Sequence, residues 1–212
     1  MERSSGTIRK DLPVSGSDAT SDGQRRPRAD ARRNAEALLD AAKAVFASFG
    51  VDAPAKQIAD AAGVGVGTLY RHFPRRSDLV KAVFQREVDA CADAARTLLA
   101  EEAPGVALER WLYRFTEFVA TKYGLADALH SGDPAFDELP AYFMGRFGPA
   151  LASLLEAASA SGDIRAAVSA DELLFAVANL CRPIGEPDID QSRRMVAILV
   201  NGLRFEAAGS SG

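Results

Sequence analysis

The segment from Gly63 to Phe73, read together with the short stretch before it, constrains the fold of this chain more than any other feature. It reads Gly-Val-Gly-Val-Gly-Thr-Leu-Tyr-Arg-His-Phe. Residues 54–62 predict a short helix, Gly63 a tight turn, and the residues after it a second short helix that ends before Pro74. Two short helices joined by a glycine-containing turn are typical of a helix-turn-helix, whose second helix enters the major groove of DNA.

Glycine-rich segments also occur in nucleotide-binding loops and in plain turns. A phosphate-cradling loop requires a preceding apolar strand and a Lys-Ser or Lys-Thr ending, and this segment has neither. A plain surface turn does not require polar side chains on the helix that follows. Here the outer face of that helix offers groups that can hydrogen-bond to a phosphate or a base edge, namely Thr68, Tyr70, Arg71 and His72. DNA reading is therefore the interpretation that the segment favours.

Residues 35–84 resemble the DNA-binding domain of the TetR family of bacterial transcriptional regulators. The matching positions are Leu38-Leu39, Ala42 to Phe49, Gly50, Ile58-Ala59, Ala62-Gly63-Val64, the seven consecutive residues Gly67 to Phe73, Leu79 and Val83-Phe84. Beyond this frame the chain resembles the family only in its length and all-helical character. Pro54 stands where Thr or Ser is usual, and Gly65 replaces a common Ser, so the operator sequence does not follow from the resemblance.

The resemblance implies an all-α fold, with an N-terminal three-helix helix-turn-helix DNA-binding domain followed by a C-terminal helical domain for ligand binding and dimerisation. It implies a transcriptional regulator, by default a repressor, that binds a palindromic operator in double-stranded DNA as a homodimer and is released by a small-molecule effector. Whether the chain represses or activates stays open at this point, as does the identity of any effector.

Positions that match the family's DNA contacts can be given roles. We expect Val66 to pack on a thymine methyl group, Gly67 to allow close approach, and Thr68 to contact a base or a phosphate. Arg71 is expected at a base or a phosphate, and phosphate contacts are expected from Tyr70, His72, Lys56 and Arg76. His72 has an alternative role in capping the turn or packing against it.

Charge divides the chain into two parts of opposite sign. Residues 1–86 hold 15 Lys and Arg against 10 Asp and Glu, whereas residues 87–212 hold 10 against 19. The net charge of −4 alone argues against a non-specific nucleic-acid binder, but a basic front on an acidic body suits a single domain that faces a polyanion. We expect the DNA-binding domain over 28–75, the helical domain over 76–207 and a flexible tail over 208–212.

The first 27 residues lack periodic apolar positions and are expected to be a disordered basic arm. The arm ends in a basic cluster, Gln24 to Arg28, which is either a solvated tail or a contact to phosphate or the minor groove. The apolar spacing of Leu38, Ala42 and Phe46 then predicts a first helix that starts at about Asp30 and ends at Gly50.

The rest of the chain shows helical spacing and no strand-like alternation. A long helix over 76–100 belongs partly to each domain, which makes it the candidate for carrying a signal between them. Another helix is expected after Pro104-Gly105, and Gly148-Pro149 is expected to kink or shorten a later one. Further helices are predicted over 125–130, 136–160, 169–181 and 189–205.

The last two helices are the candidates for the dimer contact, because their apolar faces would form a four-helix interface. The residues concerned are Leu173, Leu174, Val177, Leu180, Val196, Leu199, Val200 and Leu203. The alternative is that these faces are buried within one chain, and the spacing does not separate the two. A helix-turn-helix used only to dock another protein is also conceivable, and it would be indifferent to changes at Tyr70 or Lys56.

The family resemblance implies an effector pocket between about Trp111 and Arg182. The candidate walls are Trp111, Phe115, Phe143 and Phe147, and the candidate polar anchors are His130, Asn179 and Arg182. The alternative for most of the aromatic residues is an ordinary core. Pockets for small molecules are mostly apolar with a few polar groups, so composition alone fits both.

Several other classes are disfavoured. The chain has only two histidines and no Cys/His spacing suited to zinc, so we expect no enzyme activity, no metal and no cofactor. Cys91 and Cys181 lie in apolar patterns, which favours inert thiols in a reducing cytosol over a redox sensor. No apolar run is long enough to cross a bilayer. A cytoplasmic protein, associated with the nucleoid when bound to DNA, is the expectation.

Overall fold

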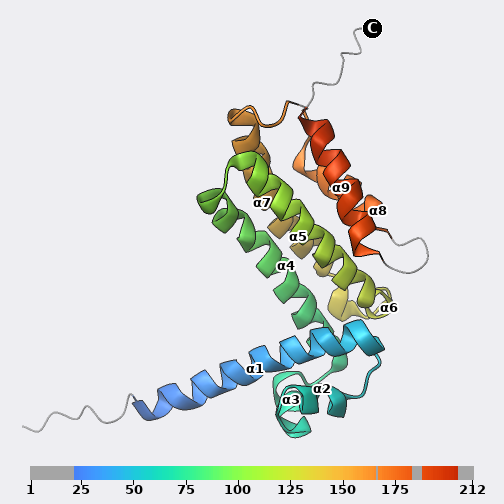
Figure 1. Ribbon diagram of the computed structural model, residues 1–212. Helices are drawn as coiled ribbons and strands as arrows, with labels where there is room; N and C mark the ends of the chain where they lie inside the picture. The colour runs from blue at the N-terminus through green and yellow to red at the C-terminus, as the bar shows by residue number, and fades with distance from the viewer. Residues whose placement is uncertain (1–21, 166, 183–187, 205–212) are drawn as a thin grey trace, which may run out of the picture.

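The computed structural model describes residues 22–165, 167–182 and 188–204, and these residues form helices joined by short loops, without a strand (Figure 1). The helices in chain order are α1 (Asp22–Phe49), α2 (Ala55–Ala61), α3 (Val66–His72), α4 (Arg76–Glu101), α5 (Pro104–Gly124), α6 (Ala126–Leu129), the 3-10 turn η1 (Pro134–Phe136), α7 (Leu139–Ala160), α8 (Ala170–Leu180) and α9 (Ile189–Leu203). The all-helical fold class predicted from the sequence is confirmed.

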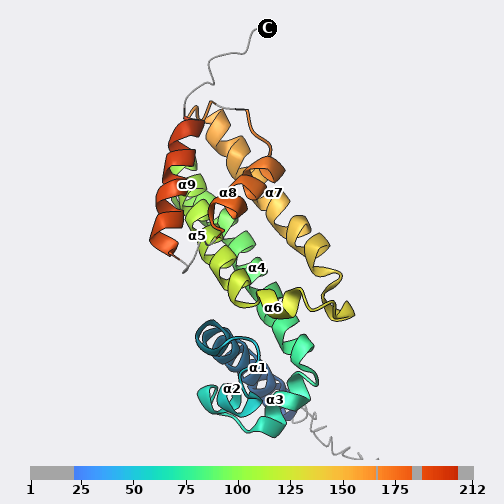
Figure 2. The ribbon, with the colours of Figure 1, turned by 90° about the vertical axis from the view of Figure 1, so that its right-hand side faces the viewer.

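The three N-terminal helices form a small unit at one end of an elongated bundle made of the later helices (Figures 1 and 2). Its core is made by Leu38 and Phe46 of α1, Ile58 of α2 and Leu69 of α3, each at most 3% exposed. Burial of each such side chain contributes roughly 1.5–3 kcal/mol. This core therefore fixes the orientation of α3 on the other two helices.

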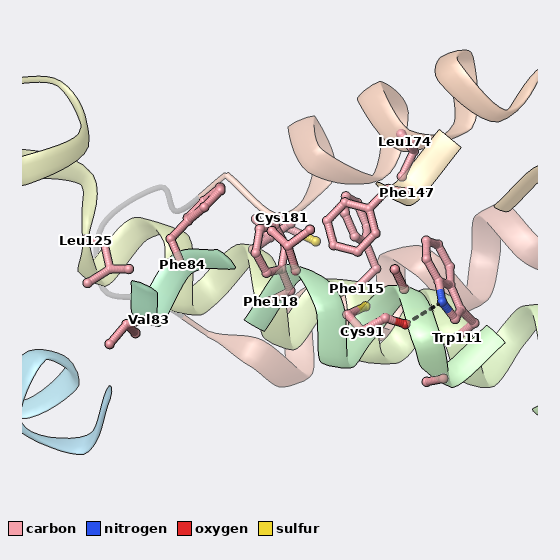
Figure 3. Packing of buried hydrophobic residues seen from close by; sticks show 14 of the residues in the cluster. Val83, Phe84, Cys91, Trp111, Phe115, Phe118, Leu125, Phe147, Leu174 and Cys181 are labelled. Carbon is pink, nitrogen blue, oxygen red and sulfur yellow. Dashed lines mark hydrogen bonds between the residues drawn. The ribbon is translucent and has the colours of Figure 1, made fainter. Parts of the chain in front are cut away.

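The long helix α4 leads from this unit into the bundle, where it packs against α5 and α7. Figure 3 shows the centre of the bundle, in which Trp111 and Phe115 of α5 lie against Phe147 of α7. The Trp111 indole N–H donates a 2.8 Å hydrogen bond to the backbone carbonyl of Cys91 on α4. The indole therefore satisfies its buried donor while it fills the space between three helices.

A polar clamp on the side of the bundle joins α4 to α7. Asp89 accepts a 2.7 Å hydrogen bond from the Tyr142 hydroxyl and another of 2.7 Å from Nε of Arg146. The same guanidinium binds Asp93 one turn along α4 at 2.9 Å. Charge-assisted bonds of this kind set the register between two helices as well as their distance.

A second set of ion pairs joins the N-terminal unit to α4. Lys43 of α1 lies 2.6 Å from Glu87, and Arg86 lies 2.8 Å from Asp40 of α1. These contacts cross between segments more than forty residues apart in the chain. The orientation of α4 is thus coupled to the position of the DNA-binding unit.

Two helix boundaries differ from the sequence expectation. Helix α1 begins at Asp22, so residues 22–27 belong to a helix and not to a disordered arm. Apolar periodicity detects only the part of a helix that has regularly spaced apolar residues, and the sequence of residues 22–27 has none. Helix α7 continues through Pro149 and is not ended by it. Residues 1–21, Phe205 and the predicted tail at 208–212 lie outside the described residues.

Other boundaries follow local chemistry that the sequence displays. The predicted capping box at the start of α8 is present, because Ser169 Oγ accepts from the Glu172 backbone N–H and Glu172 accepts from that of Ser169. Gly50 and Gly63 adopt φ angles of +77° and +68°, a conformation that favours glycine, directly after α1 and α2. The helix-turn-helix therefore has its turns where the glycines stand.

Candidate nucleic-acid interface and pocket

The outer face of α3 carries the side chains predicted to contact DNA. Leu69 points into the core, which turns Tyr70 and Arg71 outward, and the Tyr70 side chain is 52% exposed. Thr68 and His72 are half-buried at the edges of this face. An aromatic hydroxyl, a guanidinium and a hydroxyl on one exposed helix face can bind both phosphate oxygens and base edges.

The start of α3 is open on its outer side. Gly65 precedes the helix with an extended backbone and makes no side-chain cap, and a Cβ added there would meet nothing within 4 Å. A Cβ at Gly67 would meet only the Arg71 guanidinium, at 3.9 Å. Since nothing in the described chain fills this space, the backbone of α3 is accessible to a closely approaching partner.

The other side chains predicted to contact DNA differ in how exposed they are to solvent. Lys56 is exposed and pairs with Asp60 at 2.6 Å, one turn along α2. Such i,i+4 pairs contribute only about 0.3–0.5 kcal/mol, so Lys56 can exchange this partner for a phosphate. Val66 is half-buried against the core. The His72 ring lies 6.2 Å from that of Phe73, so the packing role allowed for it is compatible with its position.

Arg76, which the sequence reading expected at a phosphate, has partners within its own chain, and its contact with DNA stays a prediction. Its guanidinium is turned inward, donates a 2.5 Å hydrogen bond to the Val51 carbonyl and another to the Ala53 carbonyl, and lies 5.8 Å from the Phe46 ring. Arg76 therefore holds the loop between α1 and α2 against the start of α4. The exposed cation at this point is its neighbour Arg75, which pairs with Asp78 at 2.9 Å. Adjacent arginines cannot be told apart by type, so the sequence offered no signal for this choice.

The basic cluster expected at the N-terminal arm falls on α1 residues whose side chains are outside the described part of the chain. The backbone of α1 extends well beyond α2 and α3 on one side of the unit (Figure 1). Contact of Gln24 to Arg28 with DNA stays a prediction.

The bundle contains a pocket of about 320 Å³ at the end near the DNA-binding unit. We call it the apolar pocket, and it is lined by Phe84, Lys122, Leu129, His130, Phe136, Leu139, Pro140, Phe143, Met144 and Phe175. Of the residues predicted as an effector site, it contains Phe143 and His130. A neighbouring pocket of about 290 Å³, the side pocket, shares Lys122, His130 and Phe175 with it and adds Tyr123, Ala126, Ala178, Asn179 and Arg182.

Three predicted pocket walls are core residues instead. Trp111, Phe115 and Phe147 are fully buried and pack on one another, with ring centroids 5.2–5.8 Å apart. Aromatic spacing on a helix indicates an inward face, but it does not say whether a neighbour or a cavity lies opposite. The wall residues that the sequence reading missed, such as Leu129, Phe136 and Met144, lie on other segments and meet only in the fold.

The residues predicted at a dimer contact are mostly buried within this chain. Helix α8 packs on α7, and α9 packs on α5. These contacts bury Leu173, Leu174, Val177, Val196, Val200 and Leu203, while Leu199 is half-buried and Leu180 is 42% exposed. The alternative reading, burial within one chain, holds for the six buried residues. Helical spacing reports that a face is buried, not which chain covers it.

Both cysteines are buried. Burial raises the pKa of the Cys91 thiol to about 12 and raises that of Cys181 as well. A thiol is nucleophilic only as the thiolate, so both are unreactive at neutral pH in the folded chain. No three His, Cys, Asp or Glu side chains of the described residues converge in a way that would hold a metal ion.

Among the described helices, none is long and apolar enough to cross a membrane.

Two family profiles match the chain. Residues 38–83 match "Bacterial regulatory proteins, tetR family", and residues 103–205 match "Transcriptional regulator SbtR-like, C-terminal domain". An HTH-type transcriptional regulator of Staphylococcus aureus is 41% identical over 63 residues, which are 29% of this chain and 34% of that protein. The chain thus matches about a third of the length of that relative.

Solved structures extend the similarity to nearly the whole described chain. A TetR transcriptional regulator of Streptomyces coelicolor is 35% identical with a TM-score of 0.68, covering 80% of this chain and 98% of that one. A TetR transcription regulatory protein of Mycobacterium vanbaalenii is 37% identical with a TM-score of 0.67, covering 84% and 99%. Fold, helix-turn-helix and similarity agree: the chain belongs to the TetR family of helix-turn-helix DNA-binding transcriptional regulators, a family that is not enzymatic.

Proposed function

We propose that this chain is a cytoplasmic repressor that binds a palindromic operator as a homodimer and leaves it when a small molecule occupies the bundle. The observation that carries the DNA-binding part is the exposed face of α3, where Tyr70 and Arg71 point outward beside the open backbone of Gly67. Lys56 on α2 supplies an exposed cation next to this face. Arg76 is left out of the contact set because both of its terminal nitrogens, Nη1 and Nη2, donate to the backbone of the α1–α2 loop.

The need for two copies follows from the size of the recognition helix. Seven residues of α3 span about 10 Å at 1.5 Å per residue, which covers only a few base pairs. Helix-turn-helix dimers place two such helices about 34–36 Å apart on one face of the duplex, and the operator then has matching two-fold symmetry.

We place the dimer contact on the exposed side of α8 and α9, which contact each other. Phe175 and Leu180 on α8 are 59% and 42% exposed, and Ile198 on α9 is 64% exposed. Large apolar side chains that remain exposed together are typical of protein interfaces. The same helices as in the sequence expectation are used, but largely with different residues.

The dimer contact can be tested by sedimentation of the Ile198→Asp variant. We expect the parent to be dimeric and the variant to dissociate, because an aspartate cannot be buried unpaired between two copies. The matched control is Val106→Asp, which alters an exposed apolar residue at the start of α5. Dimers that persist in Ile198→Asp as fully as in the control would place the contact elsewhere.

Release by a ligand is supported by the position of α6 between the apolar pocket and the DNA-binding unit. Leu129 and His130 line that pocket, while Asp127 and Ala128 line a cleft whose other side includes Arg76. A ligand that displaces this turn would therefore disturb the hydrogen bonds that hold the α1–α2 loop. Couplings of about 1–3 kcal/mol change affinity some 5- to 150-fold, which suffices for a switch.

The first experiment is selection of bound sequences from random duplex DNA at a stated salt concentration. We expect the parent to enrich a palindrome and Tyr70→Ala to lose that enrichment. Tyr123→Ala, which removes an exposed tyrosine from α5, is the matched control and should enrich the same palindrome. If Tyr70→Ala and the parent select equally well, the face of α3 described above does not read DNA.

A further inference from the structure

The walls of the apolar pocket come from six elements, α4, α5, α6, η1, α7 and α8, which surround an apolar interior. Phe84 on α4, Phe136 at η1 and Phe143 and Met144 on α7 supply rings and a flexible thioether. Methionine adapts to ligands of irregular shape, and rings favour flat or extended hydrocarbon. The volume of about 320 Å³ is at the small end of the range for ligand pockets, roughly 300–1,000 Å³.

The mouth of this pocket is basic. Lys122 and His130 lie on the boundary between the apolar pocket and the side pocket, and Arg182 lines the side pocket. Among the described residues that line either pocket, none is Asp or Glu. This is unexpected by composition, because residues 87–212 hold 19 acidic against 10 basic side chains. The basic groups are thus gathered at one opening of an acidic domain.

Lys122 differs from the paired arginines Arg146 and Arg193 of the bundle in its partners. Arg146 and Arg193 bind carboxylates of other helices, at 2.7 Å and 2.5 Å respectively. Lys122 forms no ion pair with a carboxylate within the described ranges, and its Nζ lies 5.9 Å from the Phe143 ring. Its ammonium group therefore lies over an aromatic wall, and in the part of the chain that the structure describes no carboxylate occupies its hydrogen-bond donors.

His130 has a fixed orientation at the same opening. Its Nδ1 lies 2.8 Å from the Ala126 carbonyl, so this nitrogen carries the proton and donates it along the short helix. In the neutral ring the other nitrogen, Nε2, is then an acceptor. A neutral imidazole cannot donate from Nε2 to an anion, so the ammonium group of Lys122 is the donor that an anion would bind at this opening.

Taking the ligand-responsive repressor proposed above as the starting point, we propose that the effector is an amphipathic organic anion: a carboxylate, or an acid of similar charge, attached to an aromatic or aliphatic body. The body lies among Phe84, Phe143 and Met144, and the acid group binds Lys122 at the mouth. A cationic ligand would be repelled by the Lys122 ammonium group. A neutral ligand would bring no charged acceptor for that group.

Three probes of the same shape separate these chemical classes. 1-Naphthylacetate carries the anion, 1-naphthylacetamide is its neutral counterpart, and 1-naphthylethylamine is cationic. Binding is measured on the full chain by calorimetry and by the rise in unfolding temperature, which follows from ligand binding to the folded state alone. We expect the carboxylate to bind about tenfold more tightly than the amide, because a hydrogen bond between charged groups is stronger than one to a neutral group by about the free energy that a tenfold change in affinity represents.

The variants locate the charge. Lys122→Met keeps most of the side-chain stem and should weaken the carboxylate about tenfold while leaving the amide unchanged. Lys122→Glu should reverse the preference, so that the amine binds better than the carboxylate. Arg114→Met is the matched control, because Arg114 is an exposed cation on α5 that lines neither pocket, and it should change nothing.

Equal binding of carboxylate and amide, or of the carboxylate to parent and Lys122→Met, would overturn the inference. The inference would also be overturned if none of the three probes bound at up to about 1 mM to a chain that still binds its operator. The proposal of DNA binding would be unaffected by that result. If the carboxylate binds through Lys122 but leaves the operator complex intact, the ligand class is supported and release by that ligand is refuted.

Discussion

Helices α2 and α3 of the DNA-binding unit and the helical bundle give their basic side chains different partners. In the bundle, Arg146 bridges from α7 to Asp89 on α4, and the contact fixes one helix against another. On α2 and α3, Lys56 pairs only with Asp60 one turn away, and Arg71 is exposed. Cations that bind distant carboxylates contribute to the fold, whereas cations with a weak local partner are available to a phosphate.

Arg76 and Lys122 show that position in the chain does not determine the partners of a cation. Arg76 lies at the edge of the DNA-binding unit but acts as a bundle arginine does, because its donors bind the backbone of the α1–α2 loop. Lys122 lies in the bundle but lacks a carboxylate partner among the described residues. The role of a cation is therefore indicated by the groups that it binds, and not by its location in the chain.

The largest expected effect tests whether the bundle depends on its aromatic core. Trp111→Ala should lower the free energy of unfolding by about 4 kcal/mol, because it leaves a large cavity and removes the hydrogen bond to Cys91. Urea unfolding measures this value. Phe49→Ala is the control, since that ring is 65% exposed at the end of α1 and lies in neither pocket nor the proposed dimer contact, and it should change the value by less than about 1 kcal/mol. Similar losses in both variants would show that burial in this core is not what stabilises the bundle.

The next effect separates Arg76 from the DNA-contacting cations. Arg76→Met should lower the free energy of unfolding by about 1–3 kcal/mol, because the carbonyls of Val51 and Ala53 lose their donor. The salt dependence of operator binding should stay as in the parent. Arg75→Met, at the exposed neighbour, should leave stability within about 0.5 kcal/mol. A normal stability in Arg76→Met with a reduced salt dependence would return this residue to the phosphate contacts.

A smaller effect is expected at Lys56, where the salt dependence of operator binding should change and the stability should not. Lys56→Met should leave the free energy of unfolding within about 0.5 kcal/mol, because its only described partner is an exposed carboxylate on the same helix. The plot of log binding constant against log salt should lose about one unit of slope, as expected for one phosphate contact. Titration of a fixed operator at several salt concentrations measures this slope, and an unchanged slope would remove Lys56 from the interface.

The smallest effect concerns acid stability at a loop far from the DNA-binding unit. Asp163 accepts hydrogen bonds from the Ser161 hydroxyl and the Gly105 backbone N–H, and these hold its pKa below the ordinary value of 3.8. A lowered folded-state pKa means that this stabilisation is present above pH 3.8 and is lost as the pH falls through the folded value. Asp163→Asn should therefore reduce the drop in stability below about pH 4, while operator binding near pH 7 stays unchanged. Urea unfolding between pH 2 and pH 7 provides the comparison, and a parallel acid limb in both proteins would contradict this role.

The sequence predicted local structure well where the signal is local. Gly50 and Gly63 indicated the two turns, and Ser169 with Glu172 indicated the start of α8 through a capping box that the structure contains. The seven residues from Gly67 to Phe73 identified the recognition helix and the family. Each of these signals depends on the backbone conformation of a few neighbouring residues, so it survives without knowledge of the fold.

The candidate site was predicted less evenly. The outward face of α3 follows from helical geometry, because burying Leu69 determines which side chains point away. The hydrogen bonds of Arg76 to the α1–α2 loop were not predicted, because its partners lie more than twenty residues away in the chain. Trp111 was placed at a cavity and not in the core because spacing cannot show what lies opposite an inward-facing ring.

The sequence by itself determined that this chain is helical, that it carries a helix-turn-helix, and which side of the recognition helix faces outward. Those properties depend on backbone preference and on a repeat of 3.6 residues, both of which are local. Only the tertiary structure decided that Arg76 holds a loop, that Leu173 and Val196 are buried in their own chain, and that Phe136 and Met144 share a pocket with Lys122. These features depend on contacts between residues that are far apart in the sequence. Local sequence patterns do not show which distant residues pack together, so the sequence alone could not predict them.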